Sequence, residues 1–543
     1  MNGSRLAGAL LAALLVFGGM GAAGAQDVSG GSTTIALNGD SITVEGDGAT
    51  VDGGIVTITA AGSYSLSGVL ADGQVVVDTE DAGLVTLILN GVDISSSTSA
   101  PVNVVNAEAV TITLADGTQN TLTDGAAYVY ASADEDEPNA ALFSNDDLTI
   151  DGSGSLTVTA NYNDGISSDD SLTISGTPTI TVSAVDDAIQ VSTVFTMLDG
   201  SLDLVAGGGS SATLSEDLSG KGIKADEMID IEGGSITIDA ADDAIRSETD
   251  LILNDGAIVI TAIGKAIHAS YNLEVNGGNV EILTADEGLE GGFITINGGY
   301  FDITTTDDGI NVSEPDDIPN TSLYYLHING GFIVVTADGD GIDSNGSIVM
   351  NGGTVIVNGP TASDNGALDY DGTFDITGGL LIAVGSAGMP SAPGDTSSQY
   401  VVLANLDAAQ EAGTLIHLES ADGETLLTFA AAKSYQSLVF SSPALAEGVT
   451  YTVSTGGSAS GSEDAGLYVE GEYTAGTEQA SFTISSVVTQ VGNVRGFGGG
   501  MGMRGERPEG MPEPPEGFTP GEMPEGFVPG EMPVITPEGE AAG

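Results

Sequence analysis

Short segments rich in Val, Ile, Leu and Ala alternate with polar turns along residues 33–395. The apolar residues do not recur at the spacing of an amphipathic helix, and the segments are too short for helices of ordinary length. Glycine is abundant, with 80 residues in the chain, and it interrupts the pattern at nearly every turn. The pattern therefore predicts many short β-strands joined by glycine-containing turns.

A repeat organises these segments from residue 163 onwards. Its core has two residues that are often acidic, then Gly or Ala, then Ile or Leu, then a polar residue. Most copies follow one another at 21 to 23 residues, and two longer steps of 34 and 32 residues contain the insertions GGGSSATLSEDLS and SEPDDIPNTSLYY. A second motif, Asn-Gly-Gly, keeps the same interval. The copies of the core begin at residues 163, 186, 220, 242, 264, 286, 307 and 339.

A period near 22 residues, with short strands and glycine at each bend, is typical of a parallel β-solenoid. The period is too short for a propeller blade, and the pattern of a leucine-rich repeat is absent. We therefore predict an all-β fold in which residues 26–395 form a right-handed parallel β-helix with about 22 residues per coil. Residues 33–162 repeat less strictly, and we assign them to the earlier coils.

Three further segments complete the predicted organisation. Residues 396–492 alternate like antiparallel strands and are expected to form a small β domain. Residues 493–543 are rich in Gly, Pro, Glu and Met and are expected to be a disordered tail. Residues 1–25 have the features of a signal peptide, with cleavage expected before Gln26. We therefore expect a secreted, extracellular and monomeric protein, with attachment to the cell surface left open and no insertion into a membrane.

The charge of the chain restricts its partners. It has 78 acidic residues against 9 lysines and arginines, for a formal net charge of −69. Nucleic acid and anionic membranes are excluded as partners because they would be repelled. The composition fits a protein that binds cations or that must stay soluble outside the cell.

Stacking of the coils would bring the acidic pairs of successive repeats within about 4.8 Å of one another. Each pair of like charges would then repel by roughly 3 kcal/mol at an effective dielectric near 20. A hard divalent cation relieves this repulsion, and calcium suits clusters that offer only oxygen ligands. Alternatively, Asp before Gly satisfies the amides of a turn at the coil corner. The predicted calcium ligands are Asp186, Asp187, Asp242, Asp243, Asp286, Glu287, Asp307, Asp308, Asp340 and Asp343.

The few cations of the predicted solenoid lie on three consecutive coils. Lys221 and Lys265 occupy the second position of the acidic pair, whereas Lys224, Arg246 and His268 follow Ile in successive copies. We therefore expect the latter three to form a row along one strand face. Such a row would engage carboxylates repeated along an acidic polysaccharide such as polygalacturonate.

Aromatic residues extend the predicted carbohydrate site, because sugar rings stack on exposed aromatic side chains. Several of them occur in the coils beside the cations or in the second insertion: Tyr271, Phe293, Tyr300, Phe301, Tyr324 and Tyr325. We include Tyr271 and Tyr300 among the predicted binding residues. The full predicted set is Lys221, Lys224, Arg246, Lys265, His268, Tyr271 and Tyr300. An alternative role for the cations is internal neutralisation, in which Lys265 bridges Asp243 and Glu287 on neighbouring coils.

Three stretches of the repeat carry a family resemblance: SGKGIKADEMIDIEGGSITIDAADDAIRSETDLILNDG, ADEGLEGGFITINGGYFDITTTDDGINVS and ALFSNDDLTIDGSGSLTVTANYNDGISSDDSLTI. They resemble the bacterial carbohydrate-binding β-helix proteins, which are extracellular and similar in fold to family 9 pectate lyases. The resemblance implies a right-handed helix, calcium at the Asp-rich corners, and binding of cellulose-type and acidic polysaccharides without demonstrated catalysis. One departure stands out: Gly264-Lys265 replaces the expected Asp-Asp, so Lys265 would take the place of an ion.

We therefore expect a secreted, non-catalytic protein that binds polysaccharides of plant or microbial origin in a calcium-dependent manner. One alternative is a calcium-dependent lyase in which Lys221, Lys224 or Lys265 removes the proton next to a uronate carboxylate. Neighbouring carboxylates would raise the pKa of such a lysine, which is the wrong direction for a base at neutral pH. A second alternative is a surface scaffold that calcium only stiffens.

Overall fold

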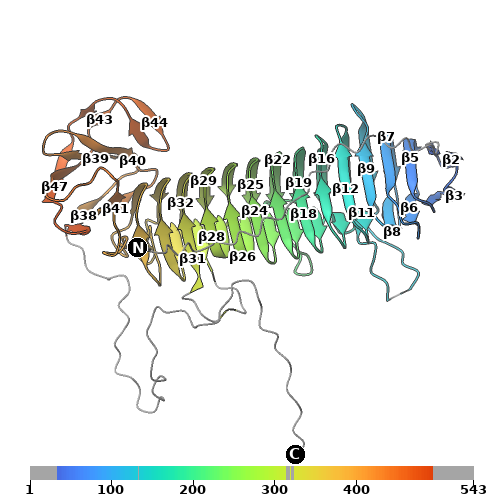
Figure 1. Cartoon of the computed structure of the whole chain (residues 1–543), viewed down its shortest axis with the longest axis horizontal. Coiled ribbons are helices and arrows are strands. Elements are labelled where there is room, and N and C mark those ends of the chain that lie inside the picture. The colour runs from blue at the N-terminus through green and yellow to red at the C-terminus, as the bar shows by residue number, and fades with distance from the viewer. Residues whose placement is uncertain (1–32, 133, 314–317, 319–322, 493–543) are drawn as a thin grey trace, which may run out of the picture. The chain divides into compact units, whose positions relative to one another are not determined.

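The computed structural model describes residues 33–132, 134–313, 318 and 323–492. These residues form an all-β structure without an α-helix, so the predicted fold class is confirmed at that level (Figure 1). The described part contains no helix long and apolar enough to cross a membrane. The predicted signal peptide at 1–25 and the predicted tail at 493–543 lie outside the described residues.

Each repeat contributes strands to three rows, and parallel pairing joins equivalent strands of successive repeats. Row one contains β11 (Ala140–Ser144), β14 (Asp164–Ser168), β17 (Ile189–Val191), β20 (Ile223–Ala225), β23 (Ile245–Ser247), β26 (Ile267–Val275), β28 (Leu289–Ile296), β30 (Ile310–Val312) and β33 (Ile342–Ser344). Row two contains β12 (Leu148–Gly152), β15 (Leu172–Ile174), β18 (Val194–Met197), β21 (Met228–Ile231), β24 (Asp250–Leu253), the second halves of β26 and β28, β31 (Tyr325–Ile328), β34 (Ser347–Met350) and β36 (Phe374–Ile376). Row three contains β13 (Ser155–Ala160), β16 (Thr179–Ala184), β19 (Ser201–Ala206), β22 (Ser235–Ala240), β25 (Ala257–Ala262), β27 (Asn279–Thr284), β29 (Tyr300–Thr305), β32 (Phe332–Ala337), β35 (Thr354–Asn358) and β37 (Leu380–Gly385).

The same rows continue toward the N-terminus with longer and less regular strands. Two pairs at that end are antiparallel, β1 with β2 and β3 with β4. The strands are β1 (Thr33–Gly39), β2 (Ile42–Glu45), β3 (Ala49–Asp52), β4 (Ile55–Ile58), β5 (Gly62–Leu70), β6 (Gln74–Asp78), β7 (Val85–Ser95), β8 (Val102–Asn106), β9 (Val110–Leu114) and β10 (Gln119–Thr123).

The register between coils follows the spacing of the sequence motifs. Ile223 pairs with Ile245, which pairs with Ile267, and Ile267 pairs with Leu289. These residues are buried, and so are the alternate apolar residues of all three rows, which together form one continuous core. The stacked parallel strands are consistent with a solenoid, whereas the predicted right-handedness of the coil stays a prediction.

Turns between rows two and three depend on the Asn-Gly-Gly motif. Its second glycine adopts a left-handed conformation, with φ of 92° at Gly278 and 90° at Gly331, which an L-residue rarely adopts. The asparagines of the motif form a ladder of side-chain hydrogen bonds from coil to coil, at 2.8 to 2.9 Å. The ladder consists of Asn254, Asn276, Asn297, Asn329 and Asn351.

Most strand pairs beyond β37 are antiparallel. β41 (Tyr435–Ser441) pairs with both β37 and β38 (Val401–Gln410), and β38 also pairs in parallel with β48 (Val488–Val491). A separate six-stranded sheet follows the order β44 (Ser462–Asp464), β45 (Leu467–Val469), β40 (Thr425–Ala430), β39 (Leu415–Ser420), β42 (Thr450–Thr455) and β47 (Thr477–Thr483). Short strands β43 (Ser458–Ala459) and β46 (Tyr473–Thr474) form a two-stranded sheet.

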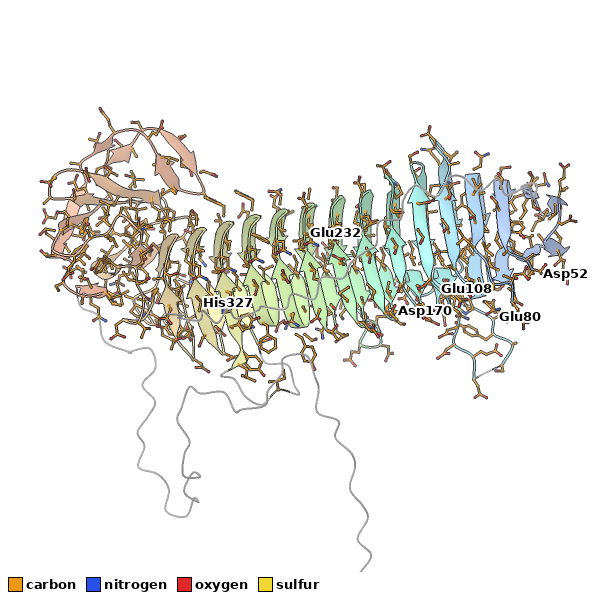
Figure 2. All side chains as sticks on the ribbon, in the orientation of Figure 1. Asp52, Glu80, Glu108, Asp170, Glu232 and His327 are labelled. Carbon is orange, nitrogen blue, oxygen red and sulfur yellow. The ribbon has the colours of Figure 1, made fainter. Side chains whose placement is uncertain are left out.

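Acidic side chains project from the outside of many coils (Figure 2). Asp52, Glu80, Glu108, Asp170 and Glu232 are all exposed and come from widely separated coils. The large negative charge is therefore spread along the outer surface, where water solvates it. Few of the described acidic residues are buried, and most of these, including Asp164, Asp187 and Asp243, lie at the corner before row one.

Candidate functional site

The candidate site is the corner at which the chain enters row one. The buried Ile and Leu residues of the motif pair in register, so the residues just before and after them also stack from coil to coil. We call the second residue of each acidic pair the corner column, which consists of Asp164, Asp187, Lys221, Asp243, Lys265, Glu287, Asp308 and Asp340. We call the position after Ile or Leu the strand column, which consists of Ser167, Gln190, Lys224, Arg246, His268, Glu290, Asn311 and Asp343.

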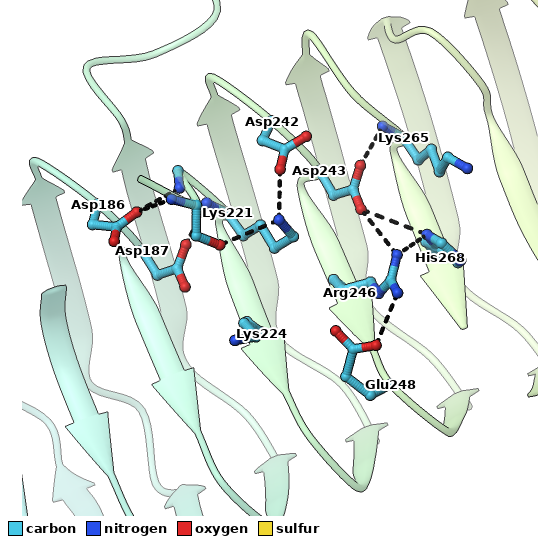
Figure 3. Close-up of polar contacts among 12 residues, drawn as sticks. Asp186, Asp187, Lys221, Lys224, Asp242, Asp243, Arg246, Glu248, Lys265 and His268 are labelled. Atoms are coloured by element: carbon cyan, nitrogen blue, oxygen red, sulfur yellow. Dashed lines mark hydrogen bonds and ion pairs between the residues drawn. The ribbon is translucent and has the colours of Figure 1, made fainter. Parts of the chain in front are cut away.

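Both lysines of the corner column contact carboxylates on the next coil. The Nζ atom of Lys221 lies 2.5 Å from Oδ2 of Asp242 (Figure 3). The Nζ atom of Lys265 lies 3.5 Å from Oε2 of Glu287 and also pairs with Glu290. Burial alone would lower the pKa of each lysine, but the hydrogen-bonded carboxylate and the other carboxylates nearby together outweigh burial and raise the pKa. Both side chains are therefore firmly protonated.

The strand column forms the expected row across β20, β23 and β26. Arg246 Nη2 lies 2.8 Å from Glu248, and Arg246 Nη1 lies 2.7 Å from Nδ1 of His268. The same imidazole nitrogen lies 3.5 Å from Asp243 and 3.4 Å from Glu290. Lys224 Nζ is 3.9 Å from Asp226, which is a loose pair at the surface.

Internal neutralisation thus has direct contacts in the structure. Lys265 pairs with Glu287 as that alternative proposes, whereas Asp243 contacts Lys265 through the backbone and accepts its N–H at 2.8 Å. The side chains of Lys221, Lys224, Arg246 and Lys265 are between 15% and 28% exposed. Their charges are therefore partly accessible to a ligand, although each already has a carboxylate partner.

Two groups of three carboxylates occur among the described residues, one toward each end of the corner. In each group the candidate ligand oxygens lie within 4.8 Å of one another, which is close enough to share one metal ion. The first group consists of Asp164, Asp186 and Asp187. The second group consists of Asp308, Asp340 and Asp343. Asp164 is absent from our predicted ligands, although it occupies the corner column in the first copy of the motif.

Electrostatic repulsion in both groups is visible in the pKa values. Burial, followed by the charges of Asp187 and Asp186, raises the pKa of Asp164 well above its usual range. Burial also raises the pKa of Asp187 to about 6, despite the amide of Lys221 that stabilises its charge. In the second group burial is again the first cause, and the pKa values rise to about 6, 6 and 7 for Asp308, Asp340 and Asp343. A bound cation would reverse these shifts.

The remaining predicted ligands lie outside the two groups. Asp242 pairs with Lys221, Asp243 with Arg246 and His268, and Glu287 with Lys265. Asp286 accepts a hydrogen bond from the hydroxyl of Thr306. Asp307 is exposed. Calcium ligation by these five residues stays a prediction without a gathered ligand set.

Carboxylates of the corner also accept backbone amides, as the turn-amide alternative requires. Asp187 accepts the N–H of Lys221 at 2.6 Å, and Asp308 accepts that of Asp340 at 2.6 Å. Asp186 accepts the N–H of Gly220 at 2.7 Å. Each contact uses one carboxylate oxygen, and a carboxylate has a second oxygen to offer to a cation. Turn stabilisation and metal binding are therefore compatible at the same residues.

The two predicted aromatic binding residues do not share a surface with the corner column. Tyr271 is half-buried in β26, at the bend between rows one and two. Tyr300 lies in row three, where it is 37% exposed and stacks on Phe332 with ring centroids 5.4 Å apart. Phe301 is fully buried, so it packs between coils and does not face solvent.

Comparison with known proteins identifies one family that matches most of the described chain. The model of a family described as carbohydrate-binding domain-containing proteins matches residues 52–309 and 262–479. A protein of that description from Acetivibrio thermocellus is 46% identical over 111 residues, which is 20% of this chain and 39% of the relative. The chain thus spans well under two thirds of that relative. A solved polysaccharide lyase-like protein from C. thermocellum, determined as a gadolinium derivative, is 31% identical, with a TM-score of 0.35 over 46% of this chain and 94% of that one.

Proposed function

The chain belongs to the family of carbohydrate-binding domain-containing proteins, and from this membership we propose that it is a secreted, non-catalytic protein that binds polysaccharides with the help of calcium. Its ligands would be acidic polymers of the polygalacturonate type and cellulosic polymers, of plant or microbial origin. The protein would act as a monomer with a right-handed β-helix. The observation that carries the proposal is the corner, where two groups of carboxylates flank a row of partly exposed cations.

Calcium would occupy the group of Asp164, Asp186 and Asp187 and the group of Asp308, Asp340 and Asp343. Three carboxylates leave part of the coordination shell of calcium to other oxygen ligands, because calcium takes six to eight of them. A uronate carboxylate would be such a ligand. Between the two groups, Lys224 and Arg246 would contact further carboxylates of the same polymer through charge-assisted hydrogen bonds.

The pKa directions favour binding over catalysis. A lyase of this kind would need a base that is neutral near the working pH. The carboxylates beside Lys221 and Lys265 raise the pKa of both amines, so they hold their protons. A lyase with either lysine as its base is therefore the weaker proposal.

A pull-down on polygalacturonate with calcium or with chelator tests the proposed function. We expect retention that requires calcium, falls in a Lys224→Ala, Arg246→Ala double variant, and is lost in Asp308→Asn. Asp203→Asn is the matched control, because Asp203 is an exposed aspartate on β19 of row three. Ultraviolet absorbance of an unsaturated product is followed in the same samples.

Each outcome selects one function. Calcium-dependent retention with flat absorbance supports the binding protein. Rising absorbance that Lys265→Ala abolishes would make the protein a lyase. Retention on neither acidic nor cellulosic polymers, together with calcium-dependent thermal stability, would leave the surface scaffold.

A further inference from the structure

A hollow of about 190 Å³ lies on row two, a different strand row from the one that carries the cations. Its lining includes the rings of Phe293 and Tyr325, the carboxylates of Asp250 and Glu274, and the amide of Asn272. These residues come from four successive coils, through β24, β26, β28 and β31. The hollow therefore follows the stacking direction of the coils.

Two aromatic rings form the apolar part of the hollow. Phe293 and Tyr325 are paired residues of neighbouring strands, and their ring centroids are 5.4 Å apart with the planes inclined at 51°. The imidazole of His327 stacks on Tyr325 at 4.1 Å and holds its orientation (His327 is labelled in Figure 2). Phe293 is half-buried and packs against the core. Both rings are therefore held in place by their neighbours. A ligand would then lose little binding free energy to ordering these two side chains.

Hydrogen-bonding groups lie directly beside the rings. Asn272 is paired with Phe293 across neighbouring strands, and its Nδ2 donates to Oδ1 of Asp250 at 2.7 Å. Glu274 is exposed, two residues further along β26. Carboxylates and an amide next to ring faces are the groups that bind a sugar: the oxygens accept its hydroxyls, and the rings contact its C–H face.

The charge of the hollow selects between neutral and acidic sugars. None of the residues that line it is a lysine or an arginine, whereas Asp250 and Glu274 are both anionic. Burial lowers the pKa of the nearby His327, so this imidazole is neutral at physiological pH. A uronate would face two like charges with no compensating cation, and an uncharged sugar would not.

We propose that this hollow binds uncharged pyranose units of a neutral polysaccharide, with Phe293 and Tyr325 as the stacking platform and Asp250, Asn272 and Glu274 as hydrogen-bond acceptors. This inference rests on the proposed polysaccharide-binding function and adds a second site to it. The ligand would run along the stacking direction, so that consecutive coils present one ring each. Binding requires no metal, because neither ring nor acceptor belongs to a group of clustered carboxylates.

The register supplies variants that the fold already tolerates. The next coil carries Ser347 opposite Tyr325, and the preceding coil carries Asn272 opposite Phe293. Tyr325→Ser and Phe293→Asn therefore introduce residues that occupy the same column on neighbouring coils. Phe332→Thr is the matched control, because it removes a half-buried aromatic ring from row three, where Thr354 occupies the same column on the next coil, and leaves the hollow intact.

Titration calorimetry of the full chain with cellohexaose, in chelator, tests the proposal. We expect wild-type binding that survives metal removal, and a loss of roughly three- to tenfold in affinity for each of Tyr325→Ser and Phe293→Asn. Phe332→Thr should bind as the wild type does. Circular dichroism establishes that each variant is folded.

Three outcomes would overturn the proposal: no binding of cellohexaose by the wild type, binding that Tyr325→Ser and Phe293→Asn leave unchanged, or an equal loss in Phe332→Thr. Polygalacturonate retention is measured on the same variants. If that retention persists while cellohexaose does not bind, the second site fails and the proposed function stands. If both are absent, the proposed function fails as well.

Discussion

Replacement of Lys265 tests whether a cation in the corner column stabilises the fold. The amine is 3.5 Å from Glu287 and also pairs with Glu290, whose side chains are 13% and 6% exposed. At this distance an effective dielectric near 20 gives an attraction of about 5 kcal/mol, before the cost of desolvation. Removal of one partner from a buried pair costs about 3–5 kcal/mol. Because Lys265 itself is 28% exposed, we expect the cost of Lys265→Met in unfolding free energy to lie at the lower end of this range, at about 3 kcal/mol.

The loss of unfolding free energy in Lys265→Met, which we call its deficit, should grow as the pH rises. Burial and the charge of Glu290 raise the pKa of Glu287 to about 7 even beside the lysine. Without the lysine the folded-state pKa of Glu287 rises further above its unfolded value. A carboxylate with a raised pKa lowers folding stability as pH increases through its titration range. The deficit should therefore be small at about pH 5 and large at about pH 8.

Urea unfolding in chelator, followed by circular dichroism at both pH values, measures the effect. Lys224→Met is the control, because its loose pair with Asp226 at 3.9 Å should be worth less than about 1 kcal/mol. A deficit of Lys265→Met no larger than that of the control at the higher pH would refute the role of Lys265. So would a deficit that is the same at both pH values.

A companion substitution, Lys265→Asp, restores the acidic residue that the repeat has elsewhere. Position 265, Glu287 and Glu290 then correspond in register to Asp308, Asp340 and Asp343. We expect this variant to be destabilised in chelator and rescued by calcium, by about 2.7 kcal/mol at a hundredfold excess over the dissociation constant. An unchanged unfolding midpoint on addition of calcium would show that three carboxylates in this register do not suffice to hold the ion.

Three further predictions follow from the described contacts. In chelator, the melting temperature of the wild type should fall between about pH 5 and pH 8, because Asp308, Asp340 and Asp343 have folded pKa values of about 6, 6 and 7. Calcium should abolish this fall. A melting temperature that does not change with pH in chelator would contradict the raised pKa values. Asn297→Ala should cost about 1 kcal/mol in urea unfolding, because Asn297 donates to Asn276 and accepts from Asn329, each at 2.8 Å. The control is the exposed Asn279→Ala, because Ala257 occupies the same column on the preceding coil. Gly309→Ala should destabilise the fold by about 1–3 kcal/mol in the same assay, because the added Cβ would overlap Val335 and approach the carbonyl oxygen of Gly341 to 2.5 Å. Stability equal to that of the wild type would show that the corner relaxes freely around the methyl group.

The strand rows and the columns of the corner could be predicted from the sequence, because the repeat itself sets the register. A buried Ile or Leu in every copy fixes which residues stack, so the row of Lys224, Arg246 and His268 follows from counting. The partners of these cations could not be predicted in the same way. Glu248 and Glu290 reach Arg246 and Lys265 through side-chain conformations that depend on burial and competing charges, which the spacing does not encode.

Two features of the molecule were hidden by irregularities in the repeat. Asp164 belongs to the first group of carboxylates, but its copy of the motif begins with Asn163 and lacks the paired acids that mark the later copies. Tyr325 closes the second insertion in the sequence, whereas the structure begins β31 at this residue and places its ring beside Phe293. The insertion separates the two aromatic residues by 32 positions, so their stacking is visible only once the strands are paired.

The distribution of charge along the corner column explains why a protein with so few lysines places two of them there. From Asp187 to Glu287 the column alternates in sign, with Lys221 and Lys265 between carboxylates. Alternation turns a repulsion of roughly 3 kcal/mol per step into an attraction, without any bound ion. Outside this stretch the column is acidic on successive coils, and there the two groups of clustered carboxylates occur. The lysines thus confine the clustered carboxylates to the flanking coils and leave the middle of the corner neutralised without a bound ion.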